Sequence, residues 1–209
     1  TQLKALQSLV SEDHAALIIN PLTQTNLAPG IMAAAARGVR IFDVGGKTSA
    51  AAVRAAGALF VPVQTVDFWE QGRIAGRYLA ERLRETGGGR VAMIEGRPES
   101  TQSIGRIGGA LEILREQPNV DIVARSAAHF DRDLAREKTV ELLATHPDLT
   151  AFFCANDLMA LGVANGLDAP AALGNQSEGT DFPRHPLIVG VDGIEEALQA
   201  VLAGRLAAT

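Results

Sequence analysis

The sequence predicts an α/β fold, because short apolar runs alternate with stretches of helical periodicity along all 209 residues. Continuous runs such as 15–20 (AALIIN) and 187–192 (LIVGVD) are typical of strands that are buried on both faces of a parallel sheet. Parallel neighbours need crossover connections, and the intervening helices supply them. The expected class is therefore α/β with doubly wound parallel sheets.

Each strand is expected at a short apolar run, and each helix at a stretch of helical periodicity. Pro62 limits one of the strands to an edge or a break, because proline cannot donate to a strand ladder. The last residues, 206–209, are expected to begin one more strand. Strands are expected at 15–20, 39–44, 59–66, 90–96, 120–125, 150–155 and 187–192, and helices at 1–11, 26–37, 70–85, 103–116, 133–145, 157–167 and after 192.

Two irregular stretches suggest how the chain is organised. Gly87-Gly88-Gly89 divides the alternating strands and helices into a first part, 1–86, and a second part, 87–209. The stretch 168–186 is rich in Gly, Pro and Ser and is long for a helix-to-strand loop, where roughly 2–6 residues are usual. It is expected to be an exposed insertion.

Composition excludes several classes of protein. The net charge is −5 and the basic residues are scattered, so this segment is not expected to bind nucleic acid. No apolar run reaches the roughly 18 residues of a membrane helix, so no membrane insertion is expected. The one cysteine, Cys154, lies in an apolar run, which excludes an internal disulfide and predicts a buried structural thiol.

Polar residues follow several of the expected strands. In open α/β sheets, ligands bind at the carboxyl ends of the strands. Residues so placed could hydrogen-bond a polyhydroxylated ligand, or they could simply cap the following helices. Their succession at neighbouring strand ends favours a common cleft. They are Asn20, Asp43, Glu95, Asn156 with Asp157, and Asp192.

Other motifs carry no catalytic or cofactor signal. Gly46-Lys47-Thr48 resembles the end of a phosphate-binding loop, but the glycine that the motif needs is Ile41 here. The glycines of 105–109 lie inside a helix and do not open it, so they are no dinucleotide fingerprint. No hydrolytic or metal motif occurs, so neither an enzyme nor a cofactor is expected. Phe130, in a strand-to-helix loop, could stack on a sugar ring or pack beneath its loop.

Taken together, several motifs resemble the type I periplasmic sugar-binding proteins of the ribose-binding kind. In that family two α/β lobes joined by a hinge close on a small ligand, and a membrane permease or receptor reads the closed form. The resemblance implies a periplasmic solute-binding protein for ABC-type uptake. The motifs that carry it are ALIINP (16–21), VRIFDV (39–44), VDFWEQGRIAGRYLAERL (66–83), IEG (94–96) with Arg106, HFDRD (129–133), ANDLMALG (155–162) and VGVDGIEEALQAVLAGRLAAT (189–209).

The resemblance also implies ligand contacts, with no metal and no catalytic residue. Three positions depart from the ribose binders, namely Val44, Val191 and Phe68, so the ligand class stays open. The implied contacts are Asn20 and Asp43 in the first lobe, Arg106, Asn156 and Asp192 in the second, and Phe130 stacked on the ring.

The resemblance begins after the family's first strands. The segment 1–86 is therefore expected to be a partial first lobe, and 87–209 a nearly complete second lobe, with Gly87–Gly89 in the hinge. We expect an internal piece of a longer protein, with sheet edges and apolar faces left uncovered. Two alternatives share the fold: the effector-binding core of a lactose-repressor-type transcription regulator, and a periplasmic sensor domain.

Overall fold

The structure is a computed structural model that describes residues 1–63, 66–169 and 186–209. Within these ranges the chain forms two compact units. Unit 1 comprises Thr1–Asp67 with Glu99–Thr101, and unit 2 comprises Phe68–Pro98 with Gln102–Thr209. Each unit has its own apolar core. The insertion expected at 168–186 lies almost entirely outside the described residues.

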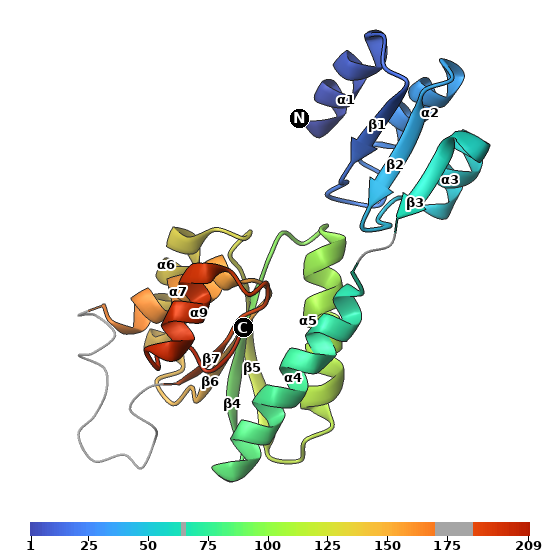
Figure 1. Cartoon of the computed structure of the whole chain (residues 1–209). Coiled ribbons are helices and arrows are strands. Elements are labelled where there is room, and N and C mark those ends of the chain that lie inside the picture. The colour runs from blue at the N-terminus through green and yellow to red at the C-terminus, as the bar shows by residue number, and fades with distance from the viewer. Residues whose placement is uncertain (64–65, 170–185) are drawn as a thin grey trace. The chain divides into compact units, whose positions relative to one another are not determined.

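Unit 1 is a three-stranded parallel sheet with helices along it (Figure 1). The core contains Leu6, Ile31 and Ile41, which are at most 4% exposed. Ile18, on the edge strand, is 76% exposed, so part of the sheet is uncovered as expected. The strands are β1 (Ala16–Ile19), β2 (Arg40–Val44) and β3 (Phe60–Val63), in that order, and the helices are α1 (Gln2–Ser11), α2 (Ala28–Ala36) and α3 (Ala50–Ala56), with a 3-10 turn at Gly57–Leu59.

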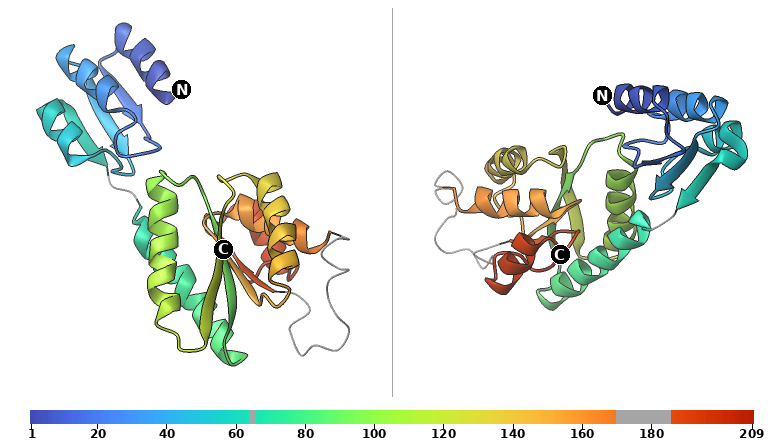
Figure 2. Two further views of the ribbon diagram at one scale, coloured as in Figure 1. Left: turned by 180° about the vertical axis from the view of Figure 1, so that it is seen from behind. Right: turned by 45° about the horizontal axis from the view of Figure 1, so that its top comes forward.

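Unit 2 is a four-stranded parallel sheet covered on both faces. Helices α4 and α5 lie on one face, and α6, α7 and α9 lie on the other (Figures 1 and 2). The strand order is β5-β4-β6-β7. The strands are β4 (Gly89–Glu95), β5 (Val120–Ala127), β6 (Ala151–Cys154) and β7 (Leu187–Val189), and the helices are α4 (Phe68–Glu85), α5 (Thr101–Arg115), α6 (Arg132–Thr145), α7 (Asp157–Leu167) and α9 (Glu195–Leu202).

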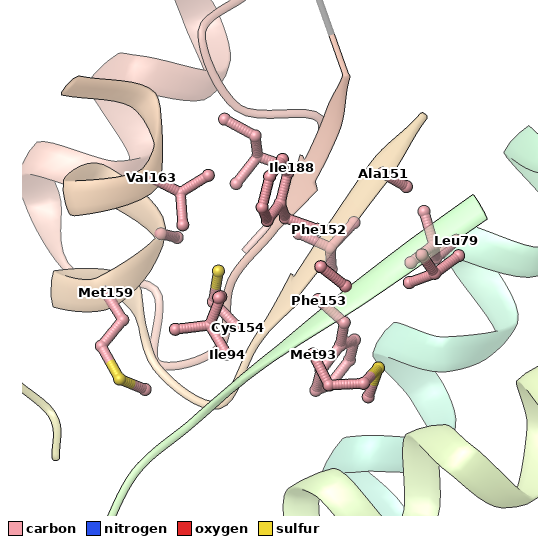
Figure 3. Packing of buried hydrophobic residues seen from close by; sticks show 14 of the residues in the cluster. Leu79, Met93, Ile94, Ala151, Phe152, Phe153, Cys154, Met159, Val163 and Ile188 are labelled. Atoms are coloured by element: carbon pink, nitrogen blue, oxygen red, sulfur yellow. The ribbon is translucent and has the colours of Figure 1, made fainter. Parts of the chain in front are cut away.

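The two central strands of unit 2 are buried on both faces, as their continuous apolar sequences predict. Successive side chains of a strand point to opposite faces, and the neighbours Phe152 and Phe153 are both 0% exposed. Figure 3 shows them among Leu79 of α4 and Met159 of α7. Cys154 is buried in the same strand, so the prediction of a structural thiol is confirmed.

The strand order creates a switch point in unit 2. From β4 the chain crosses to β5 on one side, and β6 lies on the other side of β4. The carboxyl ends of β4 and β6 therefore adjoin at the place where α/β sheets bind ligands. The expected last strand is also present in outline, since Ala208 forms a parallel bridge with Val189 and its carbonyl accepts from the Gly190 N–H at 2.9 Å.

The structure draws the boundary between the units at a different place from the sequence. Helix α4 was expected in the first lobe, but its residues Leu79 and Leu83 are buried in the core of unit 2. Gly87–Gly89 consequently lies within unit 2, between α4 and β4, and the division falls at 67/68. Gly87 and Gly88 have φ of 89° and 122°, so these glycines serve the turn that ends the helix.

Two helices differ from their sequence patterns. Helix α3 was not expected, because its alanine-rich sequence lacks an apolar period; Ser49 caps it by accepting the Ala52 N–H at 3.3 Å. In α5, Ile104 and Ile107 are three positions apart, as on one face of a helix, yet Ile104 is 56% exposed and Ile107 is 3% exposed.

Candidate functional site

Three of the expected site residues meet at the carboxyl edge of the sheet in unit 2. The Arg106 side chain, only 3% exposed, extends from α5 to this edge. Its Nη1 donates to the Ala155 carbonyl at 2.9 Å, directly before Asn156, and its Nη2 donates to Asp192 Oδ1 at 2.6 Å. The guanidinium thereby ties the end of β6 to the loop after β7.

Two further contacts of Arg106 come from α4. Its Nε donates to Gln71 Oε1 at 3.0 Å, and its guanidinium carbon lies 5.7 Å from the centre of the Phe68 ring. A buried cation is stable only when it is paired and hydrogen-bonded, and these contacts supply both conditions. We call Phe68, Gln71, Arg106, Asn156 and Asp192 the arginine cluster.

Asn156 serves the fold as well as the cluster. It is the N-cap of α7, and its Oδ1 accepts the Met159 N–H at 3.0 Å. The capping role that the sequence left open is therefore present. Because the oxygen is used by the helix, the NH2 group of this side chain is the part that can donate to a ligand.

Backbone strain is concentrated in the loops at this edge. Among the described residues, the non-glycine positions with positive φ are His129 (55°), Phe130 (66°) and Asp192 (137°). Such conformations cost free energy and persist where the surrounding structure enforces them, which is common at functional sites. Two of the three are residues that the sequence predicts to contact a ligand.

Phe130 packs on Gly96, the residue directly after β4. A Cβ on Gly96 would lie 2.1 Å from the Phe130 ring, so only glycine allows this contact. The ring is partly buried against the core of unit 2. The packing role is therefore present, and stacking on a ligand stays a prediction.

Glycines let α4 and α5 pack closely enough to position Arg106. A Cβ on Gly72 would lie 2.1 Å from the Arg106 carbonyl oxygen, and a Cβ on Gly109 would lie 2.0 Å from that of Trp69. The glycines of 105–109 thus serve helix packing, and the Trp69 indole donates to Glu112 Oε2 at 2.6 Å across the same pair.

In unit 1, Asn20 and Asp43 are connected through the loop after β2. Asp43 is 0% exposed, and its Oδ2 accepts the Thr48 N–H at 2.9 Å. Its Oδ1 is buried without a hydrogen-bond partner among the described residues. The loop returns Lys47 to the end of β1, where its Nζ donates to Asn20 Oδ1 at 3.0 Å. Asp43 therefore holds the loop that presents Lys47.

Two participants could not be recognised from the sequence. Gln71 and Lys47 gain their roles from contacts between distant segments, and only the position of Lys47 in a glycine-containing loop after a strand gives a local signal. Glu95, one of the strand-end residues, is instead engaged in an ion pair with Arg125.

Neither a metal site nor a membrane span is found where the structure describes the chain. Over 1–63, 66–169 and 186–209, no three or more His, Cys, Asp or Glu side chains gather in a way that could hold a metal ion. No helix in those ranges combines the length and the apolar character needed to cross a membrane.

Comparison with known families identifies the class of protein. A family model described as "Periplasmic binding protein domain" matches residues 1–209. The chain therefore belongs to the periplasmic binding protein domain family, as its resemblance to the type I sugar-binding proteins implied.

Similar proteins of known ligand lie within this family. The chain is 28% identical over its whole length to the D-allose-binding periplasmic protein of Escherichia coli (strain K12), and 27% identical to the Ribose import binding protein RbsB of Bacillus subtilis (strain 168). It spans 64% and 61% of the lengths of these two relatives.

Solved structures agree with this assignment. One is an ABC transporter periplasmic solute binding protein from Actinobacillus succinogenes 130z with bound D-allose, with a TM-score of 0.82 and 28% identity over 98% of this chain and 67% of that one. Another is the binding protein of the arabinose ABC transporter from Shewanella sp. ANA-3, with a TM-score of 0.81 and 25% identity over 98% of this chain and 64% of that one.

Proposed function

We propose that this protein captures a small, uncharged sugar or polyol for uptake by an ABC-type permease, and that it works in the periplasm. The arginine cluster is the observation that carries the proposal. It gathers a forked donor, an amide NH2 group and a carboxylate at the edge of unit 2 where α/β sheets bind ligands. The names of the relatives, which bind D-allose and ribose, support the ligand class and favour uptake over the repressor and sensor alternatives.

The charges of the candidate residues favour an uncharged ligand. In unit 2, the cation of Arg106 is paired with the anion of Asp192 at 2.6 Å. The arginine cluster therefore offers no uncompensated charge to a sugar acid or a sugar phosphate.

The residues also suit the hydrogen bonds that a sugar requires. A sugar hydroxyl both donates and accepts, and it loses affinity when it is buried without partners. Asp192 can accept, and Arg106 and the Asn156 NH2 group can donate. Phe130 adds an aromatic face. Asn20, Asp43 and Lys47 are proposed to contribute the contacts of unit 1.

No covalent step is part of this proposal, because a binding protein needs only a difference in affinity. We propose that ligand binding shifts an equilibrium between open and closed forms toward the closed form. A ligand can shift such an equilibrium only as far as it prefers one form. The permease would then read the closed form.

A thermal-shift screen of the purified protein tests this function. The panel contains the neutral compounds D-allose, D-ribose, L-arabinose and xylitol, with D-gluconate and ribose 5-phosphate as charged controls. A ligand that binds only the folded state stabilises that state and therefore raises the Tm. At a ligand concentration of a hundred times the Kd, the stabilisation is about 2.7 kcal/mol. We expect a rise with at least one neutral compound and none with the charged controls. A rise with the charged compounds alone, or with none of the panel, would contradict the proposal.

A further inference from the structure

The loop that carries Asp192 is held by two residues outside the arginine cluster. Asp157, the first residue of α7, is 0% exposed. Its Oδ2 accepts the Ile194 N–H at 2.9 Å, and its Oδ1 accepts the Thr209 hydroxyl at 2.5 Å. The Thr209 oxygen in turn accepts the Gly193 N–H at 3.0 Å. The two N–H groups that directly follow Asp192 are therefore both fixed by this pair.

The backbone between these bonds is in an unfavourable conformation. Asp192 has a φ of 137° and Gly193 one of 67°. Before Asp192, the Gly190 N–H donates to the Ala208 carbonyl at 2.9 Å. A strained non-glycine residue persists only where its surroundings determine its conformation, and here the bonds on both sides do so.

The carboxylate of Asp157 also lies against the loop itself. A Cβ on Gly190 would lie 2.3 Å from Asp157 Oδ1. Glycine at this position lets the loop approach the buried carboxylate, and a larger residue would push the two apart. The sequence therefore combines three features that serve one contact: a buried acid, a glycine beside it and a hydroxyl that completes it.

We propose that Asp157 and Thr209 are positioning residues for ligand binding, which act by holding Asp192 in its positive-φ conformation. This proposal rests on the proposed function. Neither residue is expected to touch the ligand, since both oxygens of Asp157 and the hydroxyl of Thr209 are engaged in the bonds described. Their effect passes to Arg106, because the guanidinium donates to the same carboxylate of Asp192.

A simpler role must be separated from this one. An acidic residue in the first turn of a helix is stabilising on its own account, because it complements the helix dipole. Asp157 acting in that way alone would support α7 without any specific link to Asp192. The two roles differ in whether the effect of Asp157 and Thr209 on ligand affinity depends on the Asp192 side chain.

A double-mutant cycle makes that distinction. Thr209→Val removes the hydroxyl and keeps the shape, Thr209→Ser restores the hydroxyl, and Asp192→Gly removes the carboxylate while accepting a positive φ. D-allose affinity is measured by calorimetry for each variant. Thr145→Val is the control, because Thr145 also bonds backbone carbonyls at 3.2 Å, at the far end of α6.

We expect Thr209→Val to weaken D-allose binding about tenfold. A tenfold change in Kd corresponds to the net contribution of roughly one hydrogen bond. Thr209→Ser and Thr145→Val should bind as the unaltered protein does. In the Asp192→Gly background, Thr209→Val should cause no further loss. An equal loss in both backgrounds would show a merely structural role and would overturn the proposal.

A second measurement needs no ligand and separates this proposal from the proposed function. Amide hydrogen exchange is compared at Gly193 and Ile194 in the unaltered protein and in Thr209→Val. The proposal requires faster exchange at these two amides and unchanged exchange in α6. Unchanged exchange at both amides would overturn it. If D-allose fails to bind at all, the proposed ligand class is wrong. The exchange data still decide whether Thr209 holds the loop that carries Asp192.

Discussion

At the scale of single residues, the burial of Arg106 is the feature on which the proposed site depends. Its side chain is 3% exposed and each branch of the guanidinium has a partner. Lysine carries the same charge but lacks the planar fork that reaches three acceptors at once. The shape of the donor therefore matters here as much as its charge.

Arg106→Lys is predicted to weaken binding of a neutral sugar by about tenfold or more, since hydrogen bonds to charged groups contribute roughly 1.5–3 kcal/mol each. Calorimetric titration measures the change. Arg125→Lys is the matched control, because Arg125 is about half exposed and pairs with Glu95 outside the arginine cluster. Equal affinities of the two variants would show that the fork of Arg106 has no role in binding.

Lys47 allows a second test at this scale, in unit 1. Lys47→Met keeps the length of the side chain and removes the ammonium that donates to Asn20. We expect about a tenfold loss of sugar affinity with little change in Tm, because an exposed pair contributes little to stability. Lys4→Met, at an exposed position on α1, is the control. A Lys47 variant with full affinity would remove this residue from the site.

At the scale of elements, the packing of α4 on α5 decides where Arg106 lies. Gly72→Ala would place a Cβ 2.1 Å from the Arg106 carbonyl oxygen, and backbone cannot yield as a flexible side chain can. Overpacking of this kind costs roughly 1–3 kcal/mol. We predict a lower free energy of unfolding in urea and weaker sugar binding. Glu81→Ala, at an exposed position of the same helix, should change neither, and a fully stable Gly72→Ala would refute the close packing.

The elements also show how far sequence reasoning reaches. Strands such as 150–155 could be predicted because a strand buried on both faces is apolar throughout. Arg106 entered the predicted site through the family resemblance alone, and its partner Gln71 lies 35 positions away in the chain. Such pairings depend on helix packing, which leaves only indirect marks in the sequence. The glycines at 87–89 illustrate the opposite case, in which a clear sequence signal was assigned to the wrong structure. They were expected in a hinge, but a turn within unit 2 has the same glycine-rich composition.

At the scale of the whole molecule, one family model, the periplasmic binding protein domain, matches residues 1–209 and therefore covers both units. The chain spans 64% of the D-allose-binding relative, and the uncovered Ile18 on β1 fits that partial span. The core of unit 2, by contrast, is closed on both faces of its sheet. Its stability can therefore be followed through a group buried within it.

Cys154 provides that probe. Burial raises the pKa of its thiol well above the usual range, and the charge of Asp157 raises it further. At a pH above the pKa of the unfolded thiol, the unfolded chain has lost this proton while the folded state retains it, so the free energy of unfolding falls as pH rises. Between about pH 7.5 and pH 10, we predict that the free energy of unfolding falls less for Cys154→Ala than for the unaltered protein. Urea denaturation at each pH measures it. Equal losses would contradict a buried thiol.

A calorimetric titration of D-allose into the unaltered protein and into Asp192→Gly tests most directly whether the arginine cluster binds the sugar. We predict saturable binding by the unaltered protein and an affinity lower by about tenfold to a hundredfold in the variant, because a charged acceptor for the ligand and for Arg106 is lost. The Tm without ligand should fall, because the variant leaves the buried guanidinium of Arg106 without its paired carboxylate, so both titrations are made well below the Tm of the variant. Equal affinity of the two proteins would contradict the assignment of the arginine cluster as the sugar site.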